Sequence, residues 1–187
     1  MKYTNTEGEL QMLVEKNMLK SDLSYSDDKS KRYMLRLEWE KAKPKMSIIM
    51  LSAGSSDGIC FDKTTNLVIE NALKSGYGSV DILNLFPSVD RNFNEQSDSE
   101  NLKFIDTSAK SADIIIFAAG TGQSGNKKII RRRNDVLIAL KKYDKKLYCI
   151  SDDKGKRFYH PLCPKVKEWK IEKFDVEELI RKEYQDD

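Results

Sequence analysis

Hydrophobic and polar residues alternate between positions 33 and 40, and this pattern predicts a β-strand with one buried face. The residues on the apolar face are Tyr33, Leu35, Leu37 and Trp39. The next apolar stretch, residues 47–51, has no polar interruption, which is typical of a strand covered on both faces. Because only one face of the first strand is apolar, we expect that strand at an edge of the sheet.

Candidate strands recur about every thirty residues along the rest of the chain, which is the length of one βαβ unit. They cover residues 48–51, 80–85, 113–118 and 146–150. Amphipathic helix patterns separate them. This alternation predicts an α/β fold, namely a three-layer α/β/α sandwich with a mostly parallel central sheet and one antiparallel edge strand.

Four helix patterns lie between and after these strands. The first begins after Asp62, a typical N-cap, and stops at Gly76. The second begins at a capping box that opens with Ser97. The third covers residues 126–143, and the fourth begins at Asp175.

The first thirty residues differ in pattern from the rest. Residues 9–19 carry apolar side chains at helical spacing, and residues 21–30 are polar and rich in turn formers. We therefore expect an N-terminal helix and loop over residues 1–30 and a single α/β domain over residues 31–187. A chain of 187 residues is long enough for one such domain with a real core.

Composition and charge narrow the classes of protein. Charged residues make up 34% of the chain, above the usual ~25%, and the net charge is +3. No apolar run approaches the ~18 residues of a membrane span, and no apolar leader follows the first Met. The three cysteines lack paired metal-ligand spacing, which favours reduced thiols. These features exclude membrane proteins, disulfide scaffolds and zinc modules. We expect a cytoplasmic protein with no metal and no cofactor, and the sequence is compatible with a homo-oligomer.

Open α/β sheets bind ligands beyond the carboxyl ends of their parallel strands, where the loops converge. Here those loops cover residues 52–62, 86–94, 119–125 and 151–161, and three of them are rich in small or polar residues. Such loops let the backbone approach a ligand and present N–H groups to an anion or a base edge. The candidate ligand-binding residues at this edge are Ser52, Gly54, Ser55, Asn84, Gly120, Thr121, Gly122 and Ser124. The alternative is that glycine and serine serve only to turn the chain.

Gly120, Gly122 and Gly125 spell the G-x-G-x-x-G pattern of dinucleotide-binding folds. The pattern follows the third strand of the series rather than the first. The next acidic residues, Asp152 and Asp153, also come later than the usual ~20 residues. An anion-binding loop of another kind is therefore favoured.

A basic cluster follows this loop, from Lys127 to Arg133. We expect Lys127 and Arg131 to contact the phosphate groups of a nucleotide or a nucleic acid. The alternative is that the cluster is a solvated helix face.

His160 is the only histidine, so any histidine chemistry depends on it. It follows the last parallel strand, on the side where the site is expected, and it is the candidate catalytic residue. The alternative is a structural side chain that forms a hydrogen bond ahead of a proline.

Several segments, taken in order, resemble an uncharacterised bacterial and phage family, the domain-of-unknown-function family numbered 1643. The resemblance covers about residues 31–164 and is most specific at Asn84-Leu85-Phe86 and His160-Pro161-Leu162. It implies a fold more than a function.

That family in turn is similar to the uracil-DNA glycosylase fold, which has a small-residue motif after the first strand, a later Asn and a His-Pro after the last strand. This resemblance implies that His160 stabilises a departing base and that Asn84 reads a base edge. The first motif departs from the pattern. The family typically reads Asn-Pro-Ser-Thr where this chain has Ser52-Ala53-Gly54-Ser55, so Asp57 or Asp62 would have to hold the water.

Three functional hypotheses follow. The first is a protein that binds a nucleotide, a nucleobase or a nucleotide-derived ligand in a glycosylase-like pocket without cleaving it. The second is an enzyme that hydrolyses an N-glycosidic bond in DNA or a nucleotide, with His160 stabilising the leaving base. The third is a DNA-binding or partner-binding module that uses the basic cluster.

Overall fold

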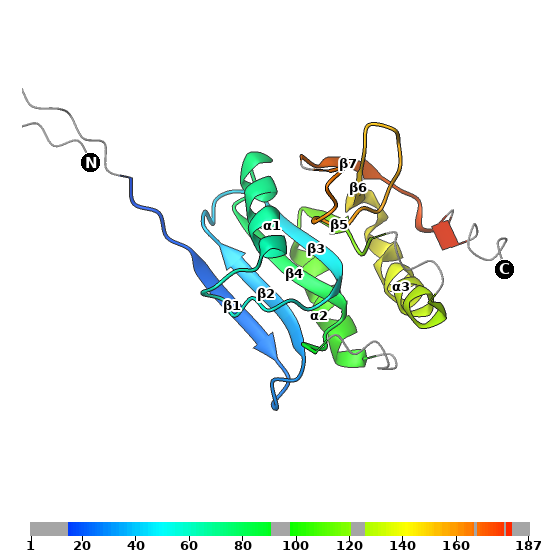
Figure 1. Ribbon diagram of the computed structural model, residues 1–187, viewed down its shortest axis with the longest axis horizontal. Helices are drawn as coiled ribbons and strands as arrows, with labels where there is room; N and C mark the ends of the chain where they lie inside the picture. Colours follow the sequence, from blue (N-terminus) through cyan, green and yellow to red (C-terminus); the bar gives the residue numbers. More distant parts are fainter. Residues whose placement is uncertain (1–14, 91–97, 121–125, 167, 178, 181–187) are drawn as a thin grey trace, which may run out of the picture.

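A seven-stranded sheet with helices on both faces forms the body of the protein (Figure 1). This computed structural model describes residues 15–90, 98–120, 126–166, 168–177 and 179–180. The strand order is β1-β2-β4-β3-β5-β6-β7. Helix α1 covers one face of the sheet, and α2 and α3 cover the other, so two cores form and the three-layer arrangement is confirmed.

The centre of the sheet follows the sequence pattern closely. It consists of β3 (Lys45–Ser52), β4 (Ser79–Phe86), β5 (Ile114–Phe117) and β6 (Leu147–Ser151). All neighbouring pairs among these strands are parallel. Their side chains alternate between the two cores. In β4, for example, Val80 and Ile82 pack on the α1 side, and Leu83 and Leu85 pack on the other side.

The two edges of the sheet differ from the expectation of one antiparallel edge strand. At one edge, β1 (Lys20–Tyr25) pairs with β2 (Arg32–Glu38), and β2 pairs with β4, both antiparallel. At the other edge, β7 (Lys170–Lys173) is antiparallel to β6. The alternating strand β2 is therefore internal. Its less apolar face is covered by α2, where Tyr33 stacks on Phe104 and Met34 packs against the same core, so alternation alone does not identify an edge.

Strand β1 also corrects the expectation for the N-terminal segment. Residues 21–25 belong to the segment 21–30, which the sequence predicts to be loop because it is polar and rich in turn formers. An edge strand is held by its backbone ladder, however, and needs few apolar side chains. Residues 15–19 have no helical structure, and the rest of the predicted helix over residues 9–19 lies outside the described part of the chain.

The helices begin at side-chain caps. Asp62 caps α1 (Lys63–Lys74) as predicted, because its Oδ1 accepts a hydrogen bond from the N–H of Thr65 at 2.8 Å. Helix α2 (Ser99–Ser111) is capped by Asp98, so the capping box predicted to open with Ser97 is wrong. Ser97 itself lies outside the described residues.

The third predicted helix is divided in two. Asn126 caps α3 (Lys127–Leu140), and a 3-10 turn, η1 (Lys141–Lys146), leads from it into β6. Near the C-terminus, helical geometry begins at Val176, as expected, and this residue is buried. Among the described residues, no helix is both long and apolar enough to cross a membrane.

Candidate functional site

The carboxyl ends of the parallel strands bring together side chains from four separate segments on the α1 face. Asn84 lies near the end of β4 on the same face as Ile82, and Ser52 ends the neighbouring strand β3. Gly120 follows β5, and His160 follows β6. These four residues therefore lie on one side of the sheet, at the edge where the sequence predicts the site.

Asn84 is the most buried polar residue of this group, with 1% of its surface exposed. Its Nδ2 donates a hydrogen bond to the carbonyl oxygen of Ser52 at 2.7 Å. Because a carbonyl only accepts, this bond fixes the orientation of the amide and identifies the other atom as Oδ1. That Oδ1 is buried and has no hydrogen-bond partner in the structure. A buried acceptor left in this state costs about 1–3 kcal/mol, unless a ligand or water satisfies it.

The loop after β3 is tightly built around Asp62. A Cβ on Gly54 would collide with Oδ2 of Asp62, so a larger residue there would displace this carboxylate. Ser56 joins the loop to α1, since its Oγ accepts a hydrogen bond from the N–H of Asp62 at 3.0 Å and lies 2.8 Å from Thr65 Oγ1. Ser55 is exposed. The loop is therefore a fixed wall of the site.

The tip of the same loop rests on the edge strand β1. Asp57 is exposed, and its Oδ1 accepts hydrogen bonds from the N–H groups of Ile59 and Cys60 at 2.9 and 2.7 Å. Gly58 has a φ of +91°, and a Cβ on it would collide with Leu23 of β1. Of the two carboxylates considered as water-holding groups, Asp57 therefore shapes a turn, whereas Asp62 faces the site.

His160 is held in one protonation state by its surroundings. Its Nδ1 accepts a hydrogen bond from the N–H of Leu162 at 3.2 Å, so the ring proton lies on Nε2. Burial lowers the pKa of His160, and the negative charge of Asp62 partly opposes this shift. At Gly120, an added Cβ would lie 3.4 Å from the Cβ of His160. The imidazole of His160 is therefore neutral and can donate a hydrogen bond from Nε2. It lies next to the backbone of Gly120, which has no side chain.

Arg32 is a site residue that the sequence pattern did not reveal. Ser24 pairs with Met34 and Tyr25 with Arg32, so β2 contains one extra residue, Tyr33. The ring of Tyr33 stacks on Phe104 of α2. This β-bulge directs Arg32 to the opposite, α1-covered face, where its Nη1 donates to the carbonyl of Ser56 at 2.8 Å.

The basic cluster lies mainly on the other side of the sheet, because it belongs to α3. Lys127 and Arg131, which we expected to bind ligand, are exposed. Arg132 is the buried member, with 5% of its surface exposed, and its Nε donates to the carbonyl of Leu85 at 2.9 Å. Asn101 of α2 donates to the same carbonyl and to that of Asn84. Arg132 and Asn101 therefore fix the end of β4 from behind, a role that spacing alone cannot reveal. The other candidates, Thr121, Gly122 and Ser124, lie outside the described residues.

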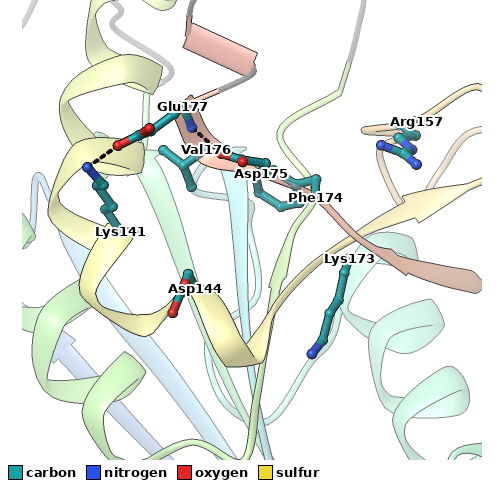
Figure 2. Close-up of a pocket in the computed structure, with 8 residues that line it drawn as sticks. All are labelled: Lys141, Asp144, Arg157, Lys173, Phe174, Asp175, Val176 and Glu177. Carbon is teal, nitrogen blue, oxygen red and sulfur yellow. Dashed lines mark hydrogen bonds and ion pairs between the residues drawn. The ribbon is translucent and has the colours of Figure 1, made fainter.

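A separate open pocket of about 610 Å³ lies between the end of α3 and residues 173–177 (Figure 2). Its charged side chains are paired with neighbours. Lys141 forms an ion pair with Glu177, and Arg157 donates to Glu172 at 3.2 Å. No atom of its lining is among the buried polar atoms without partners in the described part of the chain. This pocket therefore lacks unsatisfied buried polar atoms of the kind that occur at Asn84 and Arg32.

No cluster of three or more His, Cys, Asp or Glu side chains that could hold a metal ion occurs in the part of the chain that the structure describes. A search of curated proteins and of solved structures found no match to this chain. A family model described as "Protein of unknown function (DUF1643)" matches residues 32–162, which include the central strands and every described residue of the site. The chain therefore belongs to the DUF1643 family.

Proposed function

We propose that this protein binds a ligand carrying a nucleobase, such as a nucleotide or a nucleotide-derived compound, at the carboxyl edge of the sheet and leaves it uncleaved. The observation that carries the proposal is the amide oxygen of Asn84, which is buried, has a fixed orientation and lacks a donor. Nucleobases present ring N–H and amino groups along their edges, and these groups are suitable donors for such an oxygen.

His160 supports the same ligand class. A neutral imidazole with its proton on Nε2 donates one hydrogen bond, and the carbonyl oxygens of bases accept such bonds. An acceptor on Asn84 and a donor on His160 together match the mixed donor and acceptor pattern of a base edge. The resemblance to the uracil-DNA glycosylase fold agrees with this assignment and remains part of the proposal.

The test is a titration calorimetry panel of nucleosides and nucleoside monophosphates with the full chain. We expect one base to bind in preference to the others. Asn84→Leu should weaken its binding at least tenfold, about 1.4 kcal/mol, because the buried amide acceptor for the ligand N–H is removed. The matched control is Asn71→Leu, since Asn71 is also buried but lies near the far end of α1, where its Nδ2 and Oδ1 both have partners. Failure of every base to bind, or equal binding by Asn84→Leu, would contradict the proposal.

A second candidate function is hydrolysis of an N-glycosidic bond, and the fixed tautomer of His160 favours it. In that reaction, water adds to the anomeric carbon, the bond to the base nitrogen breaks, the base leaves as an anion, and the proton lost by the water passes to the solvent. The Nε2–H of His160 would stabilise that negative charge. Asp62 would orient the water.

The two functions are separated by the fate of the ligand. Incubation with nucleotides and with short DNA, followed by chromatography, should return the ligand unchanged if the protein only binds it. Release of free base, reduced about 10²-fold or more by His160→Ala, would establish the enzyme instead.

A further inference from the structure

Arg32 is a buried cation at the edge of the site. Its side chain is 2% exposed, and the bulge at Tyr33 places it under the loop that begins at Ser52. Burial lowers the pKa of the guanidinium, yet arginine stays charged at any physiological pH. A buried charge of this kind is costly unless an opposite charge or several acceptors compensate it.

The two sides of the Arg32 guanidinium are used differently. Nη1 donates to the carbonyl of Ser56, but Nε is buried and has no hydrogen-bond partner. Arg36, four residues along the same strand, shows how a guanidinium group binds a carboxylate. Its Nε and Nη2 hold the carboxylate of Asp81 at 2.7 and 3.0 Å. The side of Arg32 that corresponds to this carboxylate-binding fork therefore has an unsatisfied donor.

The nearest acidic group does not fill this position. Asp62 acts on Arg32 only through its charge, and its Oδ1 is already the cap of α1. No carboxylate among the described residues forms an ion pair with Arg32. The unsatisfied Nε needs an acceptor, and an oxyanion such as phosphate or carboxylate would supply both that acceptor and the opposite charge.

We propose that Arg32 binds the phosphate of the ligand, so that the ligand is a nucleotide rather than a free base or a nucleoside. This inference rests on the proposed function, in which Asn84 and His160 hold the base of the same molecule. Arg32, Asn84 and His160 come from three segments that meet on one face of the sheet. The site then has one end for a base and another for an oxyanion.

The experiment compares a nucleoside with its monophosphate for the base preferred in the calorimetry panel. We expect the monophosphate to bind at least tenfold more tightly to the wild-type chain. Arg32→Met should remove this difference and leave the affinity for the nucleoside within about threefold, because charged hydrogen bonds to the phosphate are lost. Arg32→Lys should retain only part of the difference, since lysine has the charge without the fork. Lys43→Gln, which removes an exposed cation at the opposite edge, should leave the difference intact.

A second measurement does not depend on the variants. Inorganic phosphate should raise the unfolding midpoint of the wild-type chain above that in chloride at equal ionic strength. Equal midpoints, equal binding of nucleoside and monophosphate, or equal losses for both ligands in Arg32→Met would each overturn the phosphate assignment while leaving base binding intact. If phosphate raises the unfolding midpoint but no nucleoside or nucleotide binds, Arg32 is part of an anion site and the proposed base-binding function is wrong.

Discussion

Strand β4 carries two buried polar residues, Asp81 and Asn84, whose surroundings differ in kind. Asp81 is fully buried near the amino end of the strand, on the α2 face. It accepts hydrogen bonds from Arg36 at 2.7 and 3.0 Å and from Ser108 at 2.7 Å, and Lys45 lies 2.6 Å away. Every oxygen of this carboxylate is used.

Asn84, three residues further on, belongs to a region with unmet hydrogen-bonding capacity. Its Oδ1 and the Nε of Arg32 are both buried without partners. Natural proteins keep few such atoms, and those they keep are concentrated where a ligand supplies the missing partner. The Asp81 cluster is therefore part of the scaffold, and the Asn84 region is the candidate site.

The largest effect on stability is expected from Asp81→Ala. The change leaves Arg36 and Lys45 without their shared anion and empties a buried position. We expect a loss of about 3 kcal/mol in the free energy of unfolding, measured by urea denaturation. Breaking a buried ion pair usually costs about 3–5 kcal/mol. We expect a value at the low end because Arg36 and Lys45 are both partly exposed and can reach water. A loss below about 1 kcal/mol would remove the distinction between the two regions.

The carboxylate of Asp81 should also make the free energy of unfolding depend on pH in the acidic range. Burial disfavours the charged form of Asp81, but hydrogen bonds from Arg36, Lys45 and Ser108 outweigh burial and hold its pKa below the ordinary value. A lowered pKa in the folded state contributes stability above the unfolded pKa, and that stability is lost as the pH falls through the folded pKa. Unfolding free energy measured from pH 5 down to pH 2 should fall, and the fall should be smaller in Asp81→Asn. Identical profiles for the two proteins would contradict this account.

A smaller effect is expected at the wall of the site. Asp62→Ala removes the N-cap of α1 and should cost about 1 kcal/mol. It also removes the negative charge that partly supports protonation of His160, so the pKa of His160 should fall further. Denaturation and an NMR titration of the single histidine measure the two effects separately. An unchanged or raised pKa of His160 would show that Asp62 does not act on it.

The smallest effect on stability is expected from Asn84→Leu. This change removes a hydrogen bond to Ser52 but also removes an unsatisfied buried oxygen, so the two contributions nearly cancel. We expect the free energy of unfolding to change by less than about 1 kcal/mol, while ligand binding is lost. A destabilisation as large as that of Asp81→Ala would place Asn84 in the scaffold instead.

The central βα units could be predicted from the sequence because both faces of each strand are covered and each helix has one apolar stripe. The N-cap at Asp62 and the convergence of Asn84 and His160 on one edge follow from the same pattern. The edge strands could not be predicted in this way, since β1 and β7 are held mainly by backbone hydrogen bonds. Arg32 was missed because β-bulges leave no mark in hydrophobic alternation, and one extra residue reverses the face on which a side chain lies.

The contact between Gly58 and Leu23 bears on how much of the chain the site requires. The family match begins at residue 32, but the loop that walls the site rests on β1, which precedes that residue. A shortened protein that begins at Arg32 would retain the matched sequence and lose the surface beneath the loop tip. The segment shared by the family and the segment needed to support the site therefore differ by one strand, which pairs with β2 and places the Leu23 side chain beneath Gly58.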